Sequence, residues 1–305
     1  RVLISEARVQ SLSFIGLPVH EGNSEYGTIM GPEALRAAGL LATLEDMGQR
    51  VSDLGNWRVP NGAAPKAMNV GKSRNLSKIS RWIHQIDSNC IELASDTVPI
   101  FGGGDHALSA GTIPAMSARA EREGSTLFVL WLDAHPDFHT LRSTTSGNLH
   151  GTPMAYLTGE TGFEGGFPPC VAPVPHDQVL MMGLRSVDPA ERQRLQDLKI
   201  DLCDMRRIDE QGIVRPLSEF LDRVKAANGR LHVSLDVDFL DPAIAPGCGT
   251  PVPGGLSERE GHLIMEMVHE SGLLSSLDLV ELNPIHDHAG RSARLLVDLT
   301  ASAFG

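Results

Sequence analysis

Six short, nearly continuous apolar runs recur along the chain, and longer segments with helical periodicity separate them. This alternation constrains the fold more than any other feature. The runs predict strands at Val9–Ile15, Thr97–Phe101, Leu127–Leu132, Gln178–Met182, Leu231–Val237 and Leu277–Leu282. Strands without polar alternation are typical of parallel sheets whose two faces are covered by helices. The order therefore predicts one three-layer α/β domain over residues 1–305, with a mainly parallel sheet.

Helices are predicted between and after these runs. They are expected at Pro32–Met47, Val70–Ser95 (long and broken), Ser109–Glu123, Pro189–Lys199, Ile213–Ala227, Ser257–Glu270 and Ser292–Phe304. Ser257 with Glu260 fits a capping box, and so does Asp188 with Glu191. Two segments rich in Gly and Pro are expected to be loops, Gly159–Pro175 on the surface and Asp241–Leu256 above a strand end.

Charge and composition exclude several functional classes. The formal net charge of -12 argues against a nucleic acid partner and would attract cations. The chain lacks an uninterrupted apolar run long enough for a transmembrane helix, and Arg1–Ser13 lacks the layout of a signal peptide. The 4 cysteines form no Cys-x-x-Cys pair, so neither a zinc ribbon nor a redox pair is indicated, and the cytoplasm is the expected location.

Polar residues follow four of the apolar runs at their carboxyl ends, where open α/β sheets bind ligands. These are Asp105-His106 after Gly102–Gly104, Asp133-Ala-His135-Pro-Asp137, Asp236-Val-Asp238, and Glu281 with Asn283. In an extended strand Asp236 and Asp238 would share one face and repel each other, and burying them unpaired would cost several kcal/mol or more. Neither Lys nor Arg lies nearby in the sequence, so a bound dication is the simplest remedy.

These residues predict a two-metal site. Four Asp carboxylates would balance two dications, and His106 with His135 would complete the ligand sets. Oxygen-rich sites with one imidazole per ion favour Mn, Mg or Fe(II) over the sulfur-rich zinc type. Paired ions with shared carboxylates generate a hydroxide nucleophile, so a hydrolase is predicted. The alternatives are a solvated strand end, an Asx turn at Asp133–Asp137, a core histidine at position 106 and an edge-strand ion pair at Glu281.

Five motifs resemble those of the arginase and agmatinase family, the ureohydrolases. They are GGGDHALS (102–109), DAHPDFHT (133–140), SGNLHG (146–151), SLDVDFLDP (234–242) and VELNP (280–284). The resemblance runs from about Gly16 to the end and implies a mostly parallel eight-stranded sheet and two Mn(II) ions. By matching position, one ion would be bound by His106, Asp133, Asp137 and Asp236, and the other by Asp133, His135, Asp236 and Asp238.

The resemblance also implies a reaction, in which a hydroxide that bridges both ions attacks a guanidinium carbon and releases urea. Asp137 would help to move a proton to the leaving nitrogen, His150 matches the family's proton shuttle, and Glu281 would pair with the guanidinium. The SGNLHG loop is similar to that of the arginases, so L-arginine is the expected substrate and L-ornithine the second product. The positions that match the far end of the pocket are His139 (an Asn in the best-known arginases), Thr144, Ser146, Asn148, Asp188 with Glu191 in support, and Thr250.

Three other functions compete with this prediction. An agmatinase or guanidinobutyrase-type ureohydrolase would act on a guanidine that lacks the α-carboxylate. A zinc amidohydrolase of the deacetylase type would need one metal site, and a non-enzymatic relative would lack ligands. Because family members are commonly trimers or hexamers, a homotrimer or homohexamer is expected, without a membrane partner.

Overall fold

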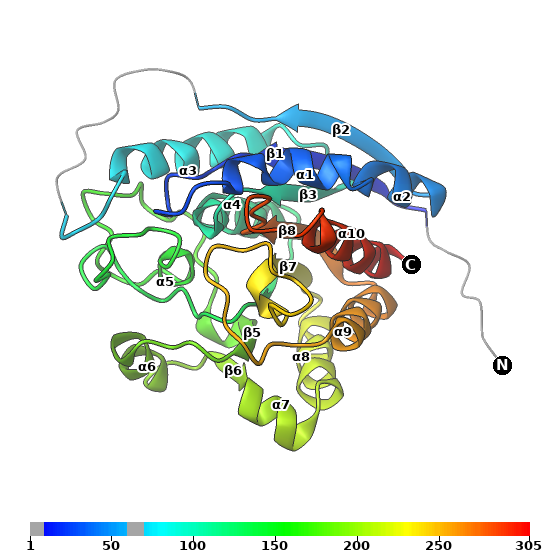
Figure 1. The fold of residues 1–305 in the computed structure, drawn as a ribbon. Helices are drawn as coiled ribbons and strands as arrows, with labels where there is room; N and C mark the ends of the chain where they lie inside the picture. Colours follow the sequence, from blue (N-terminus) through cyan, green and yellow to red (C-terminus); the bar gives the residue numbers. More distant parts are fainter. Residues whose placement is uncertain (1–8, 60–69) are drawn as a thin grey trace.

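A sheet of 8 strands forms the middle layer of the computed structural model, which describes residues 9–59 and 70–305 (Figure 1). All neighbouring strands are parallel, in the order β2-β1-β3-β8-β7-β4-β5-β6. The strands are β1 (Ser11–Leu17), β2 (Arg50–Asn56), β3 (Thr97–Gly103), β4 (Leu127–Leu132), β5 (Val179–Leu184), β6 (Asp201–Asp204), β7 (Arg230–Asp236) and β8 (Leu274–Val280). The predicted three-layer α/β architecture is confirmed. The expectation that Arg1–Ser13 is not a signal peptide concerns residues 1–8 in part, and these lie outside the described residues.

Helices cover both faces of the sheet (Figure 1). They are α1 (Gly31–Ala37), α2 (Leu40–Asp46), α3 (Leu76–Ile91), α4 (Ser109–Arg122), α5 (Pro153–Leu157), α6 (Pro189–Gln196), α7 (Met205–Gln211), α8 (Val214–Ala226), α9 (Glu258–Ser271) and α10 (Arg291–Phe304). One hydrophobic core lies under α1, α2 and α7–α10, and the other lies under α3–α6. Side chains of β4 alternate between the two cores, which explains its uninterrupted apolar sequence. None of the helices in the described ranges has the length and apolar character to cross a membrane.

The elements that the sequence did not predict are short or lie at the edges. The strands β2 and β6 have one neighbour each, and their polar, partly exposed residues hide the strand pattern. The short helices α5 and α7 were also missed. The single helix predicted at Pro32–Met47 is wrong, because Gly39 with φ 93° separates α1 from α2. The helix predicted at Val70–Ser95 is limited to Leu76–Ile91.

The four strands with polar carboxyl ends, β3, β8, β7 and β4, are neighbours in the middle of the sheet. Their carboxyl ends therefore meet at one place, and Glu281 follows a central strand. The edge-strand alternative for Glu281 is wrong. The loop predicted at Gly159–Pro175 lacks regular structure, but it is not confined to the surface, because Phe163 and Phe167 are buried against Tyr156 of α5.

Candidate metal centre

Tight turns, rather than extended strands, bring the acidic side chains together. Asp236 ends β7, and Asp238 lies in the 3-10 turn η4 (Val237–Phe239), so the expectation that both share one strand face is wrong. The turn is closed by Asp236 Oδ1, which accepts a hydrogen bond from the Asp238 N–H at 2.8 Å. Asp133 Oδ1 likewise accepts from the His135 N–H at 2.7 Å. Asp137 has a φ of 48°, a strained conformation that is typical of functional sites.

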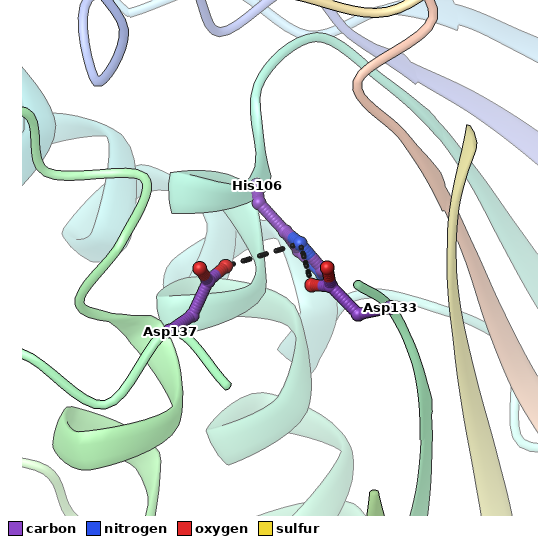
Figure 2. Close-up of side chains that lie close together, drawn as sticks. All are labelled: His106, Asp133 and Asp137. Carbon is purple, nitrogen blue, oxygen red and sulfur yellow. Dashed lines mark ion pairs between the residues drawn. The ribbon is translucent and has the colours of Figure 1, made fainter. Parts of the chain in front are cut away.

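His106 lies at the centre of the first group of ligands (Figure 2). Its Nδ1 atom is 3.1 Å from Asp133 Oδ2, 3.2 Å from Asp137 Oδ2 and 3.1 Å from Asp236 Oδ2. Within the described residues, neither His106 Nδ1 nor Asp133 Oδ2 makes a hydrogen bond, although both are buried. Buried polar atoms that converge in this way without a regular hydrogen bond are what ligands of a shared ion would show.

The ring of His106 is fixed from behind. Its Nε2 atom lies 2.9 Å from the hydroxyl of Ser234, and the indole of Trp131 stacks on it with a centroid distance of 4.0 Å. A ligating histidine is ordinarily held through its second nitrogen in this way. The Nδ1 atom is therefore directed at the carboxylates.

His135 and Asp238 form a second group beside the first. His135 Nδ1 is 3.1 Å from Asp238 Oδ2 and 3.5 Å from Asp133 Oδ1. Asp133 thus turns one oxygen toward His106 and the other toward His135. This position between the two groups fits the predicted bridging role of Asp133.

Burial and neighbouring charges shift the pKa values of the carboxylates and imidazoles in the cluster. Burial raises the pKa of Asp236 well above its ordinary value, and repulsion from Asp238 and Asp133 adds to the shift. Burial opposes protonation of His135, but Asp238 and Asp133 outweigh it and raise the pKa of His135 to about 12. The carboxylates therefore hold protons on the imidazoles, and dications would displace these protons while satisfying the same carboxylates. The residues present fit a pair of divalent ions.

Glu281 connects this cluster to His150. Its Oε1 atom accepts from the His106 N–H at 2.8 Å and lies 2.9 Å from His150 Nδ1. Burial lowers the pKa of His150, but the Glu281 carboxylate outweighs this and raises it to about 9. The Oε2 atom is 3.5 Å from Asn23 Nδ2, a residue that sequence reasoning missed because no motif marks it. Glu281 also has a strained φ of 61°.

A pocket of about 310 Å³ opens onto the cluster. It is lined by His135, Asp137, His139, Thr145, Ser146, Asn148, His150, Gly151, Ser186, Asp188, Glu191, Asp236 and Thr250. Most of the predicted pocket residues are in this set, and no Lys or Arg is among the described residues that line the pocket. Ser186 and Thr145 were not predicted, although both lie beside predicted residues. Thr144 is buried instead, and its Oγ1 accepts from the Gly147 N–H at 3.1 Å to hold the loop.

The far wall of the pocket combines a histidine with two carboxylates. His139 Nε2 is 3.1 Å from Asp188 Oδ2 and 3.6 Å from Glu191 Oε2. Both capping boxes predicted from the sequence are present, and at α6 Glu191 accepts from the Asp188 N–H at 3.2 Å. Burial raises the pKa of Glu191 to about 6. Glu191 therefore fixes the start of α6, which carries Asp188 to the pocket.

Comparisons with known proteins agree with this site. The model of the Arginase family matches residues 10–305. The chain is 52% identical to the arginase of Agrobacterium fabrum over 301 residues, which are 98% of this chain and 92% of that protein. Its structure resembles the crystal structure of arginase from Bacillus cereus, with a TM-score of 0.87, 34% identity and coverage of 97% and 98% of the two chains. It also resembles Entamoeba histolytica arginase in complex with L-ornithine, with a TM-score of 0.83, 26% identity and coverage of 98% and 99%. The chain therefore belongs to the arginase family of hydrolases.

Proposed function

We propose that this enzyme hydrolyses the guanidinium group of L-arginine to L-ornithine and urea at a centre of two Mn(II) ions. The observation that carries the proposal is the convergence of two imidazoles and four buried carboxylates beside an acidic pocket. A pocket that lacks Lys and Arg suits a cationic substrate such as a guanidinium. The relatives are arginases, which supports L-arginine as the substrate. The Entamoeba histolytica enzyme was crystallised in complex with L-ornithine, the product proposed here.

The ligand sets follow from the two groups of side chains. His106, Asp133, Asp137 and Asp236 would hold one ion, and Asp133, His135, Asp236 and Asp238 the other. Carboxylate oxygens with one imidazole per ion suit Mn(II). When bound, such a pair lowers the pKa of water and stabilises charge that develops during attack on a carbon centre.

Three side chains would handle the substrate and the protons. Glu281 would orient the planar guanidinium through Oε2, because its other oxygen is already bonded to His106 and His150. Asp137 would carry a proton to the leaving nitrogen. Burial raises the pKa of Asp137, which helps its carboxyl group to hold the proton during the transfer. His150 lines the pocket and, with a pKa of about 9, is protonated at neutral pH, so it would supply protons from solvent.

Specificity for L-arginine would come from the far wall of the pocket. The α-amino group would face the Asp188 carboxylate, and the α-carboxylate would accept hydrogen bonds from Ser146, Asn148 and His139. These donors carry no fixed charge, so they would orient the carboxylate without repelling the guanidinium. We also propose, from the family resemblance, that the single domain of residues 1–305 assembles as a homotrimer or homohexamer in the cytoplasm, which light scattering and cell fractionation would test.

The direct test is to load the protein with Mn(II) and to measure urea release from L-arginine, agmatine and 4-guanidinobutyrate side by side. We expect a strong preference for L-arginine. Activity on agmatine or 4-guanidinobutyrate instead would retain the metal chemistry and overturn the assigned specificity. Release of urea from none of the three, with two ions bound, would overturn the proposed reaction.

A further inference from the structure

Arg185 follows β5 and lies next to the metal-binding residues, although no sequence argument assigned it a role. Its guanidinium donates to the main-chain carbonyl oxygens of five residues, Gly183, Asp238, Phe239, Leu240 and Val252. Within the described residues, every hydrogen bond that this side chain makes goes to a main-chain carbonyl. Because these bonds go to the backbone, the side chain is suited to fixing the path of the chain, and its charge also attracts the nearby carboxylates of Asp238 and Asp133.

The carbonyls belong to two segments that both reach the site. Asp238 supplies a predicted metal ligand, and Val252, whose oxygen is 2.7 Å from Arg185 Nη2, lies in the loop that carries Thr250. Thr250 Oγ1 donates to Asp238 Oδ2 at 3.1 Å. Arg185, the Asp238 turn and the Thr250 loop therefore close a ring of hydrogen bonds, with the Asp238 carboxylate on its inner side.

The main chain of Arg185 contacts the other ligand turn as well. Its N–H donates to the Ala134 carbonyl at 3.0 Å, and the Ala134 N–H donates to Asp238 Oδ1 at 3.1 Å. Ala134 stands between the predicted ligands Asp133 and His135. One residue thus connects both turns that form the second ion site.

We propose that Arg185 is a positioning residue for the second metal ion, the one assigned to His135 and Asp238, and for the loop that carries Thr250. The inference rests on the proposed two-metal function. Lysine could not make the full set of contacts, because its donors share one nitrogen, whereas the guanidinium presents five donors on three nitrogens in a plane. Gly255 provides the room, since a Cβ atom there would lie 2.6 Å from Arg185 Nη2.

The chain offers a matched control at the opposite end of the sheet. Arg119 Nη2 also donates to main-chain carbonyls, those of Ala94, Ser95 and Thr97, but far from the strand ends that hold the ligands. Arg185→Lys and Arg119→Lys both disturb contacts between a guanidinium and main-chain carbonyls, and Arg119→Lys also disturbs the surface ion pair with Glu123. If both stabilise only the fold, both variants should lose thermal stability and leave metal binding unchanged.

The experiment measures the two Mn(II) dissociation constants by calorimetry on metal-depleted protein, well below the melting temperature. We expect Arg185→Lys to weaken one of the two sites about 10- to 100-fold, as is typical when the support of a ligand is lost. Arg119→Lys should keep both constants within about twofold of the wild-type values. Thr250→Val, which removes the hydrogen bond from Thr250 to Asp238, should weaken the same site by a smaller factor. If Arg185→Lys does not fold, the Mn(II) dissociation constants of Thr250→Val test the positioning role instead.

The outcomes separate the inference from the proposed function. Wild-type constants in Arg185→Lys, or in Thr250→Val where the first variant does not fold, would overturn the positioning role while leaving the two-metal function intact. Equal weakening in Arg185→Lys and Arg119→Lys would also overturn it. A wild-type protein that binds fewer than two ions would overturn the proposed function and this inference together.

Discussion

The two ends of the sheet each carry a cavity, and the larger one is not at the proposed metal centre. The cavity at the amino ends of the strands has a volume of about 540 Å³, against about 310 Å³ for the pocket at the carboxyl ends. Several of the charges at the amino end are paired within the protein. Glu123, for example, is bound by Arg119 at 3.2 Å and also by Arg230. Charge that is already paired leaves little for a ligand to satisfy.

At the carboxyl end the acidic groups are buried, and among the described residues imidazoles are the groups that form ion pairs with Asp133, Asp137, Asp236 and Asp238. Asp133 and Asp238 are 0% and 1% exposed, and their nearest ion-pair partners are His106 and His135. Burying such groups is costly unless something with positive charge completes the site. The carboxyl end therefore differs from the amino end in its buried carboxylates, and not in having the larger cavity.

The strongest test of the comparison is to remove charge from the carboxyl end. Asp133→Ala should lower urea release on the order of 10³-fold or more, because it removes the carboxylate placed between both ions and with it several kcal/mol of charge stabilisation. Metal analysis of the purified variant should find fewer than two ions per chain. A variant that still bound two ions would contradict the bridging position of Asp133.

His150→Asn should have the next largest effect. A positioned proton donor contributes about 10²-fold or more, so kcat should fall by about that factor while two ions remain bound. If His150→Asn lost metal instead of turnover, its interpretation as a proton shuttle would be wrong.

The affinity for Mn(II) should depend on pH in one direction. The pKa of His135 is raised to about 12, so its imidazole is protonated through the neutral range and must lose that proton to bind an ion. Affinity should therefore rise as the pH rises from 6 to 8, by up to about tenfold per pH unit for each proton released. Calorimetry in buffers of different ionisation enthalpy would count the protons. An affinity independent of pH would contradict the assignment of the imidazoles as ligands.

The sequence predicted the middle of this molecule better than its edges. Central strands such as Leu127–Leu132 are apolar throughout because both of their faces are buried. The edge strands β2 and β6 are partly exposed and contain polar residues, so their sequences lack the strand pattern. The cluster of acidic and histidine side chains could be predicted because short motifs at strand ends carry its members.

The support of the site could not be predicted in the same way. Arg185 acts on the carbonyls of residues 53 to 67 positions away, and Asn23 reaches Glu281 across 258 positions. Contacts with main-chain atoms, and single side-chain contacts between distant segments, leave no pattern of residue types in the sequence. They are visible only in the folded structure. The left-handed φ values of Asp137 and Glu281 could not be predicted from the sequence either. A glycine would have indicated such a conformation, but an Asp or a Glu does not.

A subtler change at the carboxyl end tests specificity rather than chemistry. His139→Asn should raise the KM for L-arginine about three- to tenfold, because the shorter side chain withdraws one hydrogen-bond donor from the α-carboxylate, and one hydrogen bond is worth about 0.5–1.5 kcal/mol. Agmatine, which lacks the carboxylate, is the control substrate, and its kinetic constants should change less. Equal effects on both substrates would place His139 outside carboxylate recognition.

The smallest effect is expected at the amino end. Glu123→Gln breaks the ion pairs with Arg119 and Arg230, yet its side chain is 23% exposed, so the free energy of unfolding should fall by only about 1 kcal/mol or less. Urea release and the binding of two ions should remain within about twofold of wild type. Denaturant unfolding and the urea assay would measure both. A tenfold loss of activity in a stably folded Glu123→Gln protein would break the comparison, because the paired charges around the larger cavity would then have to communicate with the metal centre through the sheet.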